Sequence, residues 1–142
     1  MNVLVTGGAG YIGSHTAVEL DAAGFEVVIA DNFSNSSPIV LERLETITGK
    51  RFPLYEIDVA DKTALRRVFE ENEIGAVIHF AGYKAVGESV SIPLSYYRNN
   101  IDSTLSLMEV MAEFGCKNLV FSSSATVYGK RAKLPFDEEA ET

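Results

Sequence analysis

The chain has 142 residues, of which 46% are apolar, and this suits one folded domain rather than a disordered segment. Its formal charge of −8 argues against loose binding to nucleic acid or to anionic membranes, although backbone amides can still hold an anionic small ligand. A single cysteine excludes an intrachain disulfide and favours the cytoplasm, and we expect neither a signal peptide nor a membrane helix.

Short apolar runs alternate with stretches of helical spacing along the chain. We predict strands at 2–6, 26–31, 52–58, 76–80 and 117–123, and helices at 11–23, 38–48, 61–72 and 93–114. Glycines at 24, 49 and 115 mark helix ends, Asp61 is placed to cap a helix, and Pro93 suits a first helical turn. The predicted fold class is α/β, a Rossmann-type doubly wound parallel sheet of five strands in the order 3-2-1-4-5.

A glycine-rich loop joins the first predicted strand to the first predicted helix. Gly7, Gly10 and Gly13 are spaced G-x-x-G-x-x-G within "VTGGAGYIGSH". In dinucleotide-binding folds one such glycine allows a tight turn, one lets a pyrophosphate approach the backbone, and one lets the helix pack closely. The alternative is a tight turn without a ligand, which the flanking strand and helix disfavour.

Two aspartates are placed at the ends of the next two strands. Asp31 stands roughly 20 residues after the glycines, where a carboxylate accepts hydrogen bonds from an adenosine ribose and favours NAD over NADP. Its alternative role is to cap a turn. Asp58 is a candidate acceptor for the adenine amino group, or else a cap for the helix at 61–72.

The fourth strand ends beside the switch point of the predicted sheet, where ligands bind. We therefore expect Phe80, Ala81, Gly82 and Lys84 near the middle of a dinucleotide. Lys84 is a candidate phosphate or ribose contact, against the alternative of a solvated lysine. His79 lies inside the strand and is interpreted as a core residue rather than a base.

The fifth strand ends in "FSSSATVYG", a run of hydroxyl groups at the same edge of the sheet. Ser124 and its neighbours would face the reactive end of a cofactor, or would simply satisfy backbone groups in a turn. A serine hydrolase triad is not supported, because no strand-turn-helix elbow surrounds these serines.

The segments "VTGGAGYIGSH", "HFAGYKAVGESV", "YYRNN" and "FSSSATVYG" together resemble the extended short-chain dehydrogenase/reductase family, and within it the UDP-hexose 4-epimerases. The resemblance extends from about Val3 to Gly129. It implies tightly bound NAD, a UDP-hexose substrate, and interconversion of UDP-galactose and UDP-glucose through a 4-keto intermediate. It also implies a homodimer and no metal.

The resemblance also implies roles for single residues. Ser124 would hydrogen-bond the reacting sugar hydroxyl. Besides the three glycines, the implied NAD contacts are Tyr11, Ile12, Asp31, Asn32, Phe33, Ser34, Asn35, Ser36, Asp58, Val59, Phe80, Ala81, Gly82, Tyr83, Lys84, Asn99 and Ser122.

One element of the family pattern is missing from these residues. The family's base is the Tyr of a Tyr-x-x-x-Lys motif, and no tyrosine here has a lysine four positions later. We therefore interpret residues 1–142 as an NAD-binding Rossmann domain, incomplete at its C-terminus, without the substrate domain and inactive alone. The alternatives are an NAD-binding module without turnover, or another sugar-nucleotide enzyme such as a dehydratase, against which "SSSAT" weighs.

Overall fold

A five-stranded parallel sheet organises the chain, whose computed structural model describes residues 1–129 and 133–142. The strands are β1 (Asn2–Thr6), β2 (Glu26–Asp31), β3 (Leu54–Glu56), β4 (Ile74–His79) and β5 (Asn118–Phe121). The helices are α1 (Tyr11–Ala22), α2 (Ile39–Thr48), α3 (Lys62–Glu71), α4 (Val86–Ser91) and α5 (Pro93–Glu113), followed by the short 3-10 turn η1 (Ala125–Val127). The order β3-β2-β1-β4-β5 confirms the predicted fold class.

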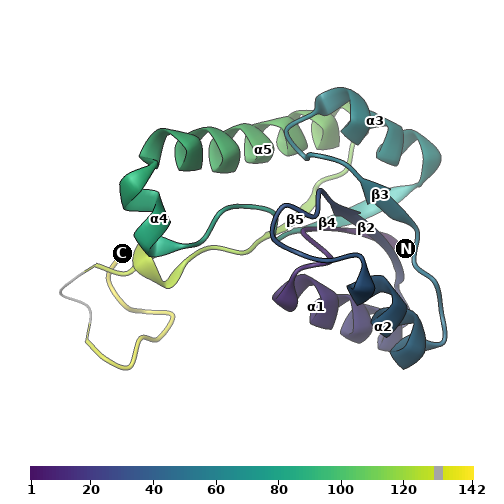
Figure 1. Cartoon of the computed structure of the whole chain (residues 1–142), viewed down its shortest axis with the longest axis horizontal. Helices are drawn as coiled ribbons and strands as arrows, with labels where there is room; N and C mark the ends of the chain where they lie inside the picture. Colours follow the sequence, from purple (N-terminus) through teal and green to yellow (C-terminus); the bar gives the residue numbers. More distant parts are fainter. Residues whose placement is uncertain (130–132) are drawn as a thin grey trace.

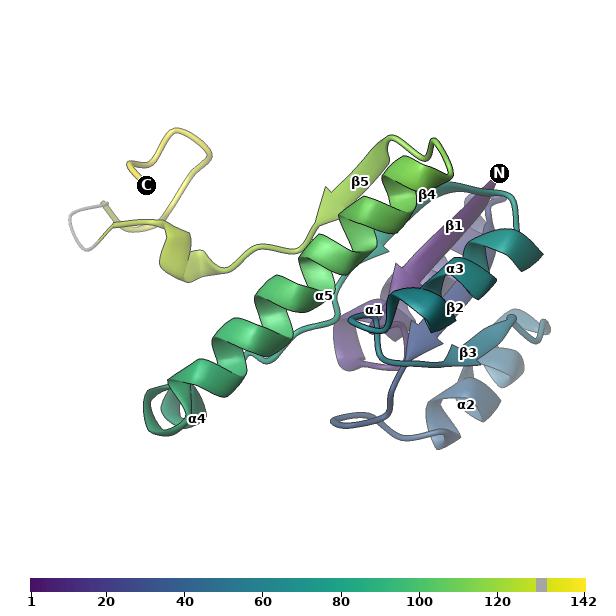
Figure 2. The same cartoon turned by 90° about the horizontal axis from the view of Figure 1, so that it is seen from above.

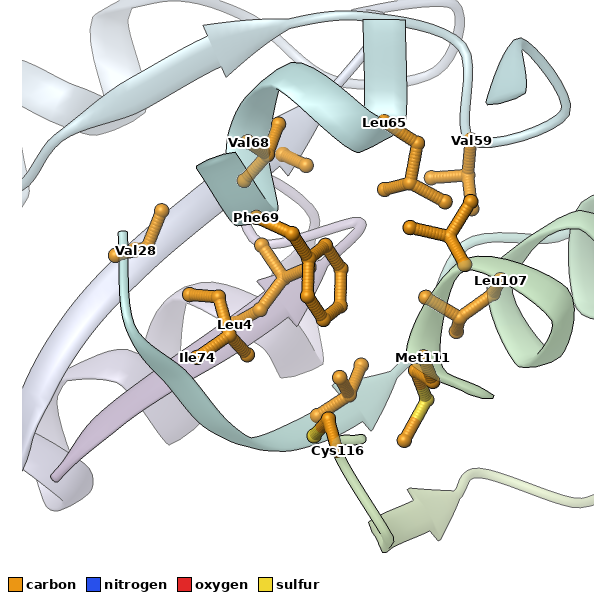
Figure 3. Close-up of a cluster of buried hydrophobic side chains, with 13 residues drawn as sticks. Leu4, Val28, Val59, Leu65, Val68, Phe69, Ile74, Leu107, Met111 and Cys116 are labelled. Carbon is orange, nitrogen blue, oxygen red and sulfur yellow. The ribbon is translucent and has the colours of Figure 1, made fainter. Parts of the chain in front are cut away.

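Helices cover both faces of the sheet (Figure 1). α1 and α2 lie on one face, and α3 and α5 lie on the other. Side chains alternate along the central strands, so Leu4 and Val28 pack toward α3 and α5 while Val5 and Ile29 pack toward α1 and α2. Figure 3 shows the first of these clusters, where Phe69 of α3 lies among the strand side chains. Burial on both faces explains why the central strands are continuously apolar.

The predicted helix boundaries are confirmed to within a residue or two. The Asp61 carboxylate accepts hydrogen bonds from the Thr63 and Ala64 amides and so caps α3. Pro93 begins α5, and Gly49 ends α2 in the left-handed conformation that glycine adopts without strain. Among the described residues no helix combines the length and apolarity needed to cross a membrane.

Two strands are shorter than predicted. β3 keeps only Leu54–Glu56 of the expected 52–58, because Pro53 has no amide to donate and Asp58 turns the chain. β5 keeps only Asn118–Phe121 of 117–123, because the chain turns into η1 at Ser124.

The helix α4 is absent from the sequence-based prediction. Its sequence, VGESVS, is poor in helix-forming residues and it buries no side chain. A hydrogen bond of 2.5 Å from the Tyr96 hydroxyl of α5 to Glu88 Oε2 holds it in place. Figure 2 shows that α5 extends past the sheet and carries α4 at its far end.

Within the described residues β5 is an edge strand, paired only with β4. Val120 and Phe121 on this strand are 60% and 53% exposed. Such an edge offers backbone donors and acceptors and an apolar stripe to a further strand or chain.

The packing of α1 on the glycine loop gives a testable consequence. A Cβ added at Gly13 would lie 2.8 Å from Gly8 Cα and closer still to the Gly7 carbonyl oxygen, both of which are backbone. We expect Gly13→Ala to lower the free energy of unfolding by about 1–3 kcal/mol, the usual cost of overpacking. Urea unfolding followed by circular dichroism measures this.

Gly87→Ala is the matched control, because a Cβ at Gly87 of α4 would meet no atom within 4 Å. It should leave the stability unchanged or raise it by up to about 1 kcal/mol through helix propensity. Equal effects of the two substitutions would contradict the packing role of Gly13.

Candidate functional site

A cleft of about 390 Å³ lies where β1, β2, β3 and β4 reach their carboxyl ends. Its walls are the glycine loop, the loop after β2, the turn after β3, the loop after β4 and the face of α5 that carries Asn99 and Ser103. Because parallel strands all end at the same edge, residues far apart in sequence meet here.

The glycine loop forms the centre of the cleft. Gly7 has a φ of +67°, and a Cβ there would lie 2.8 Å from the Ala81 amide nitrogen, so only glycine fits between the two loops. The N-cap of α1, Gly10, provides no side-chain cap, and the first turn of α1 contains no acidic residue. The amides of this first turn therefore remain available to an anion in the cleft.

Asp31 connects the glycine loop to the loop after β2. Its Oδ2 accepts a hydrogen bond from the Ala9 amide at 2.9 Å, and its Oδ1 accepts from the Phe33 amide and the Ser36 hydroxyl at 2.9 and 2.8 Å. The carboxylate is therefore a turn cap, as one alternative predicted. Among the described residues Oδ2 has this one donor, which leaves it a second acceptor position for a ligand hydroxyl.

Asp58 lines the cleft and also shapes a turn. Its Oδ1 accepts a hydrogen bond from the Ala60 amide at 2.9 Å. The alternative that Asp58 caps the helix at 61–72 is wrong, because Asp61 supplies that cap. Its second carboxylate oxygen remains a candidate acceptor for a ligand.

Lys84 supplies the positive charge of the cleft. It lines the cleft after β4, and its Nζ donates to Ser122 Oγ at 3.5 Å. Asp31 and Asp58 are the acidic groups among the lining residues of the described chain. The cleft therefore carries negative groups at the ends of β2 and β3 and a cation at the end of β4.

Three predicted site residues lie outside the cleft lining. Phe33 is in the loop after β2, where its amide donates to Asp31 Oδ1. Ser122 follows β5, and its hydroxyl accepts from Lys84 of the cleft. The exposed Ser124 hydroxyl accepts from the Thr126 amide at 3.3 Å and lies 2.9 Å from the Thr126 hydroxyl, so it caps η1, as the turn alternative predicted.

All the other predicted cofactor residues line the cleft: Gly7, Gly10, Tyr11, Ile12, Gly13, Asp31, Asn32, Ser34, Asn35, Ser36, Asp58, Val59, Phe80, Ala81, Gly82, Tyr83, Lys84 and Asn99. Three of the four sequence segments that carried the resemblance, "VTGGAGYIGSH", "HFAGYKAVGESV" and "YYRNN", thus contribute residues to the cleft, whereas "FSSSATVYG" lies outside its lining. The roles of the individual residues stay predictions.

Comparison with known proteins identifies the family of this chain. Residues 3–142 match the model of the family described as NAD dependent epimerase/dehydratase. The chain belongs to the NAD-dependent epimerase/dehydratase family. Among curated relatives it is 59% identical over 139 residues to a UDP-glucose 4-epimerase of Bacillus subtilis and 54% identical over 142 residues to UDP-glucose 4-epimerase 2 of Arabidopsis thaliana. These alignments cover 98% of the chain but only 41% of either relative.

Solved structures of this family show the same arrangement. A UDP-glucose 4-epimerase of Bifidobacterium longum in complex with NAD+ and UDP is 55% identical, with a TM-score of 0.97, and the match covers 100% of the chain and 42% of that structure. A UDP-Glc/GlcNAc 4-epimerase of Campylobacter jejuni is 35% identical, with a TM-score of 0.89, over 99% of the chain and 42% of that structure. The resemblance inferred from the sequence is thus confirmed at the level of family and fold.

Sequence analysis missed four residues that line the cleft, namely Ala30, Ile57, Ala85 and Ser103. Ala30 and Ile57 directly precede the two predicted aspartates, and Ala85 directly follows Lys84. Ser103 stands four residues after Asn99, one helical turn away on the same face of α5. Helical spacing from Asn99 was therefore a signal that could have found it.

His79 joins the sheet to α5 beneath the cleft. Its Nδ1 lies 2.7 Å from the Thr6 hydroxyl and its Nε2 lies 3.4 Å from the Thr104 hydroxyl. The side chain is 2% exposed, which confirms its prediction as a core residue. Burial lowers the pKa of His79 from 6.5 to about 4, and the positive charge of Lys84 adds to this shift.

This pKa implies a loss of stability on acidification. The unfolded chain binds a proton near pH 6.5 and the folded chain only near pH 4, so stabilisation is complete above pH 6.5 and falls as pH drops toward 4. We expect the free energy of unfolding to fall by about 2–3 kcal/mol from this group between pH 7 and 4.5. Urea unfolding at several pH values measures the slope.

His79→Gln should flatten this slope, whereas His15→Gln, at an exposed position of α1, should leave it unchanged. If His79→Gln kept the full slope, other groups would be responsible for it.

Proposed function

We propose that these residues form the cofactor-binding part of an NAD-dependent UDP-glucose 4-epimerase. The observation that carries the proposal is the cleft in which the uncapped N-terminus of α1 and its glycine loop face the Asp31 carboxylate. The family match and the UDP-glucose 4-epimerase relatives support it.

The glycine loop suits the pyrophosphate of NAD. A Cβ at Gly10 would lie 3.1 Å from the Gly7 carbonyl oxygen, so a larger residue would fill the space beside the helix terminus. Amide donors and the positive end of the α1 dipole favour a bound anion there. Lys84, on the far side of the loop, supplies the countercharge for a second phosphate or a ribose.

The adenosine end suits the strand ends on the other side. The free acceptor position of Asp31 Oδ2 would take a ribose hydroxyl, and Asp58 would accept from the adenine amino group. A 2′-phosphate would meet the Asp31 carboxylate, and no arginine lies among the cleft residues that the structure describes. This favours NAD over NADP.

Bound NAD would supply hydride transfer at C4 of the sugar, while the proton of the C4 hydroxyl would pass to a general base and return with the hydride. In our proposal Ser124 hydrogen-bonds the reacting hydroxyl of a UDP-hexose lying beyond Lys84, toward η1. A general base and the groups that hold UDP belong to a further part of the protein, in keeping with relatives more than twice as long.

The assembly and location of the whole protein are part of the same proposal. We place it in the cytoplasm as a homodimer. Exposed apolar side chains on the projecting helices, Val90, Leu94, Tyr97 and Ile101, support association. Light scattering tests the oligomeric state.

The preference for NAD should depend on Asp31. Asp31→Ala removes a charged acceptor worth about 1.5–3 kcal/mol, so NAD affinity should fall roughly 10- to 150-fold and the gap to NADP should narrow. Calorimetric titration with both cofactors measures this. Asp102→Ala, at an exposed position of α5 outside the cleft, is the control. An unchanged NAD affinity in Asp31→Ala would leave Asp31 a turn residue only.

Turnover should require residues beyond those described. We expect residues 1–142 alone to bind NAD weakly and to convert no UDP-galactose, because a positioned base typically contributes about 10² to 10⁴-fold in rate. A chain extended through a Tyr-x-x-x-Lys motif and a substrate domain should be active. The assay couples UDP-glucose formation to a dehydrogenase that oxidises it.

In the extended chain Ser124→Ala should lower the rate, with the neighbouring Ser123→Ala as control. Activity of residues 1–142 alone would refute the assignment of the base to another segment. An inactive extended chain that still binds NAD would favour the alternative of a binding module.

A further inference from the structure

The loop after β4 is held by the last side chain of "YYRNN", a residue to which the sequence assigned no role. Asn100 of α5 pairs its amide with the backbone of Tyr83 in both directions. Its Oδ1 accepts from the Tyr83 amide at 2.8 Å, and its Nδ2 donates to the Tyr83 carbonyl oxygen at 3.0 Å. The Asn100 amide thus makes the hydrogen bonds to the Tyr83 N–H and C=O that a neighbouring strand would make in a sheet.

The surroundings fit this pairing closely. Gly82 has a φ of +155°, and a Cβ there would lie 3.2 Å from Asn100 Oδ1, so the glycine leaves room for the amide. Asn99 Nδ2 donates to the same Oδ1 at 3.0 Å. This contact orients the Asn99 amide, whose residue lines the cleft.

Asn100 is itself fixed to the core through α5. Its carbonyl oxygen accepts from the Thr104 hydroxyl at 2.8 Å, and that hydroxyl lies 3.4 Å from Nε2 of the buried His79. His79 in turn contacts Thr6 at the end of β1. The loop after β4 is therefore tied to the strand that enters the glycine loop.

We infer that Asn100 is a positioning residue of the cofactor site: it holds Gly82, Tyr83 and Lys84 in place along the cleft before any ligand binds. The inference rests on the proposed function and adds to it a residue outside the cleft lining. We call the two hydrogen bonds between Asn100 and Tyr83 the clamp. Without the clamp, NAD binding would have to order the loop after β4, and the binding free energy would be less favourable by the cost of that ordering.

The clamp acts on one end of the ligand only. Gly82, Tyr83 and Lys84 follow β4, whereas Asp31 and Asp58 follow β2 and β3 on the other side of β1. AMP, which carries adenosine and one phosphate, should need only the residues after β2 and β3, namely Asp31 and Asp58. NAD should need both.

The test compares NAD and AMP binding by calorimetry in the native protein and in two variants. Asn100→Ala removes both hydrogen bonds. Asn100→Asp keeps the shape but sets a carboxylate oxygen against the Tyr83 carbonyl. Asn100→Ala should weaken NAD binding about 5- to 100-fold, from the loss of two neutral hydrogen bonds. Asn100→Asp should also weaken NAD binding, because it keeps the bond from the Tyr83 amide but replaces the second bond by repulsion between two oxygens. Both variants should leave AMP affinity unchanged.

Asn118→Ala is the matched control, since Asn118 Nδ2 donates to the Gly75 carbonyl at the amino edge of the sheet, away from the cleft. It should bind both ligands like the native protein. Folded Asn100 variants with native NAD affinity, or with equal losses for NAD and AMP, would overturn the inference. A native protein that binds neither ligand would instead overturn the proposed function.

A second measurement needs no variant. If the clamp forms in the cofactor-free native protein, the Tyr83 amide should exchange with solvent at least 10-fold more slowly than expected for an unprotected amide. Exchange at the unprotected rate would overturn the inference even if the variants failed to fold.

Discussion

The side of the cleft at the end of β2, where we propose that adenosine binds, depends on one buried carboxylate. Asp31 is 7% exposed and accepts hydrogen bonds from three donors in two loops, the glycine loop and the loop after β2. Phe33 has a positive φ of 53°, a strained conformation for an aromatic residue, and its amide is bound by this carboxylate. The position of the glycine loop relative to the loop after β2 therefore follows from Asp31, and a ligand finds both loops in place.

The opposite side of the cleft uses a neutral group for the same purpose. Asn100 fixes the backbone after β4 as Asp31 fixes the backbone after β2, and the close approach of Gly7 to Ala81 joins the two halves. A charged acceptor suits the side that would receive ribose hydroxyls. A neutral clamp suits the side where Lys84 must remain available to an anion, because a carboxylate there would compete for its charge.

The sequence predicted the strands, helices and turns well, but it predicted few of the side-chain contacts between segments that are distant in the chain. Strand order, the glycine loop and the helix caps follow from local patterns, and all were confirmed. α4 was missed because a contact between Tyr96 and Glu88, rather than helix propensity, holds it. Ala9 and Asp31 are 22 residues apart in the sequence, and Asn100 and Tyr83 are 17 apart. A pattern of neighbouring residues therefore cannot predict either hydrogen bond.

The role proposed for Ser124 stays a prediction, and its surroundings differ from those of the residues proposed to bind NAD. Asp31 and Asp58 are fixed by hydrogen bonds from backbone amides, and Gly7 and Gly13 are closely packed against backbone. Ser124 instead lies exposed on η1 with its hydroxyl engaged by Thr126, and the nearby link from Lys84 to Ser122 is long, at 3.5 Å. A substrate hydroxyl would have to replace the Thr126 contact, an exchange of one hydroxyl hydrogen bond for another that costs little. In the proposed function the described residues would thus preorganise the cofactor end of the site and leave the reacting end adjustable, and a second domain would act at that end.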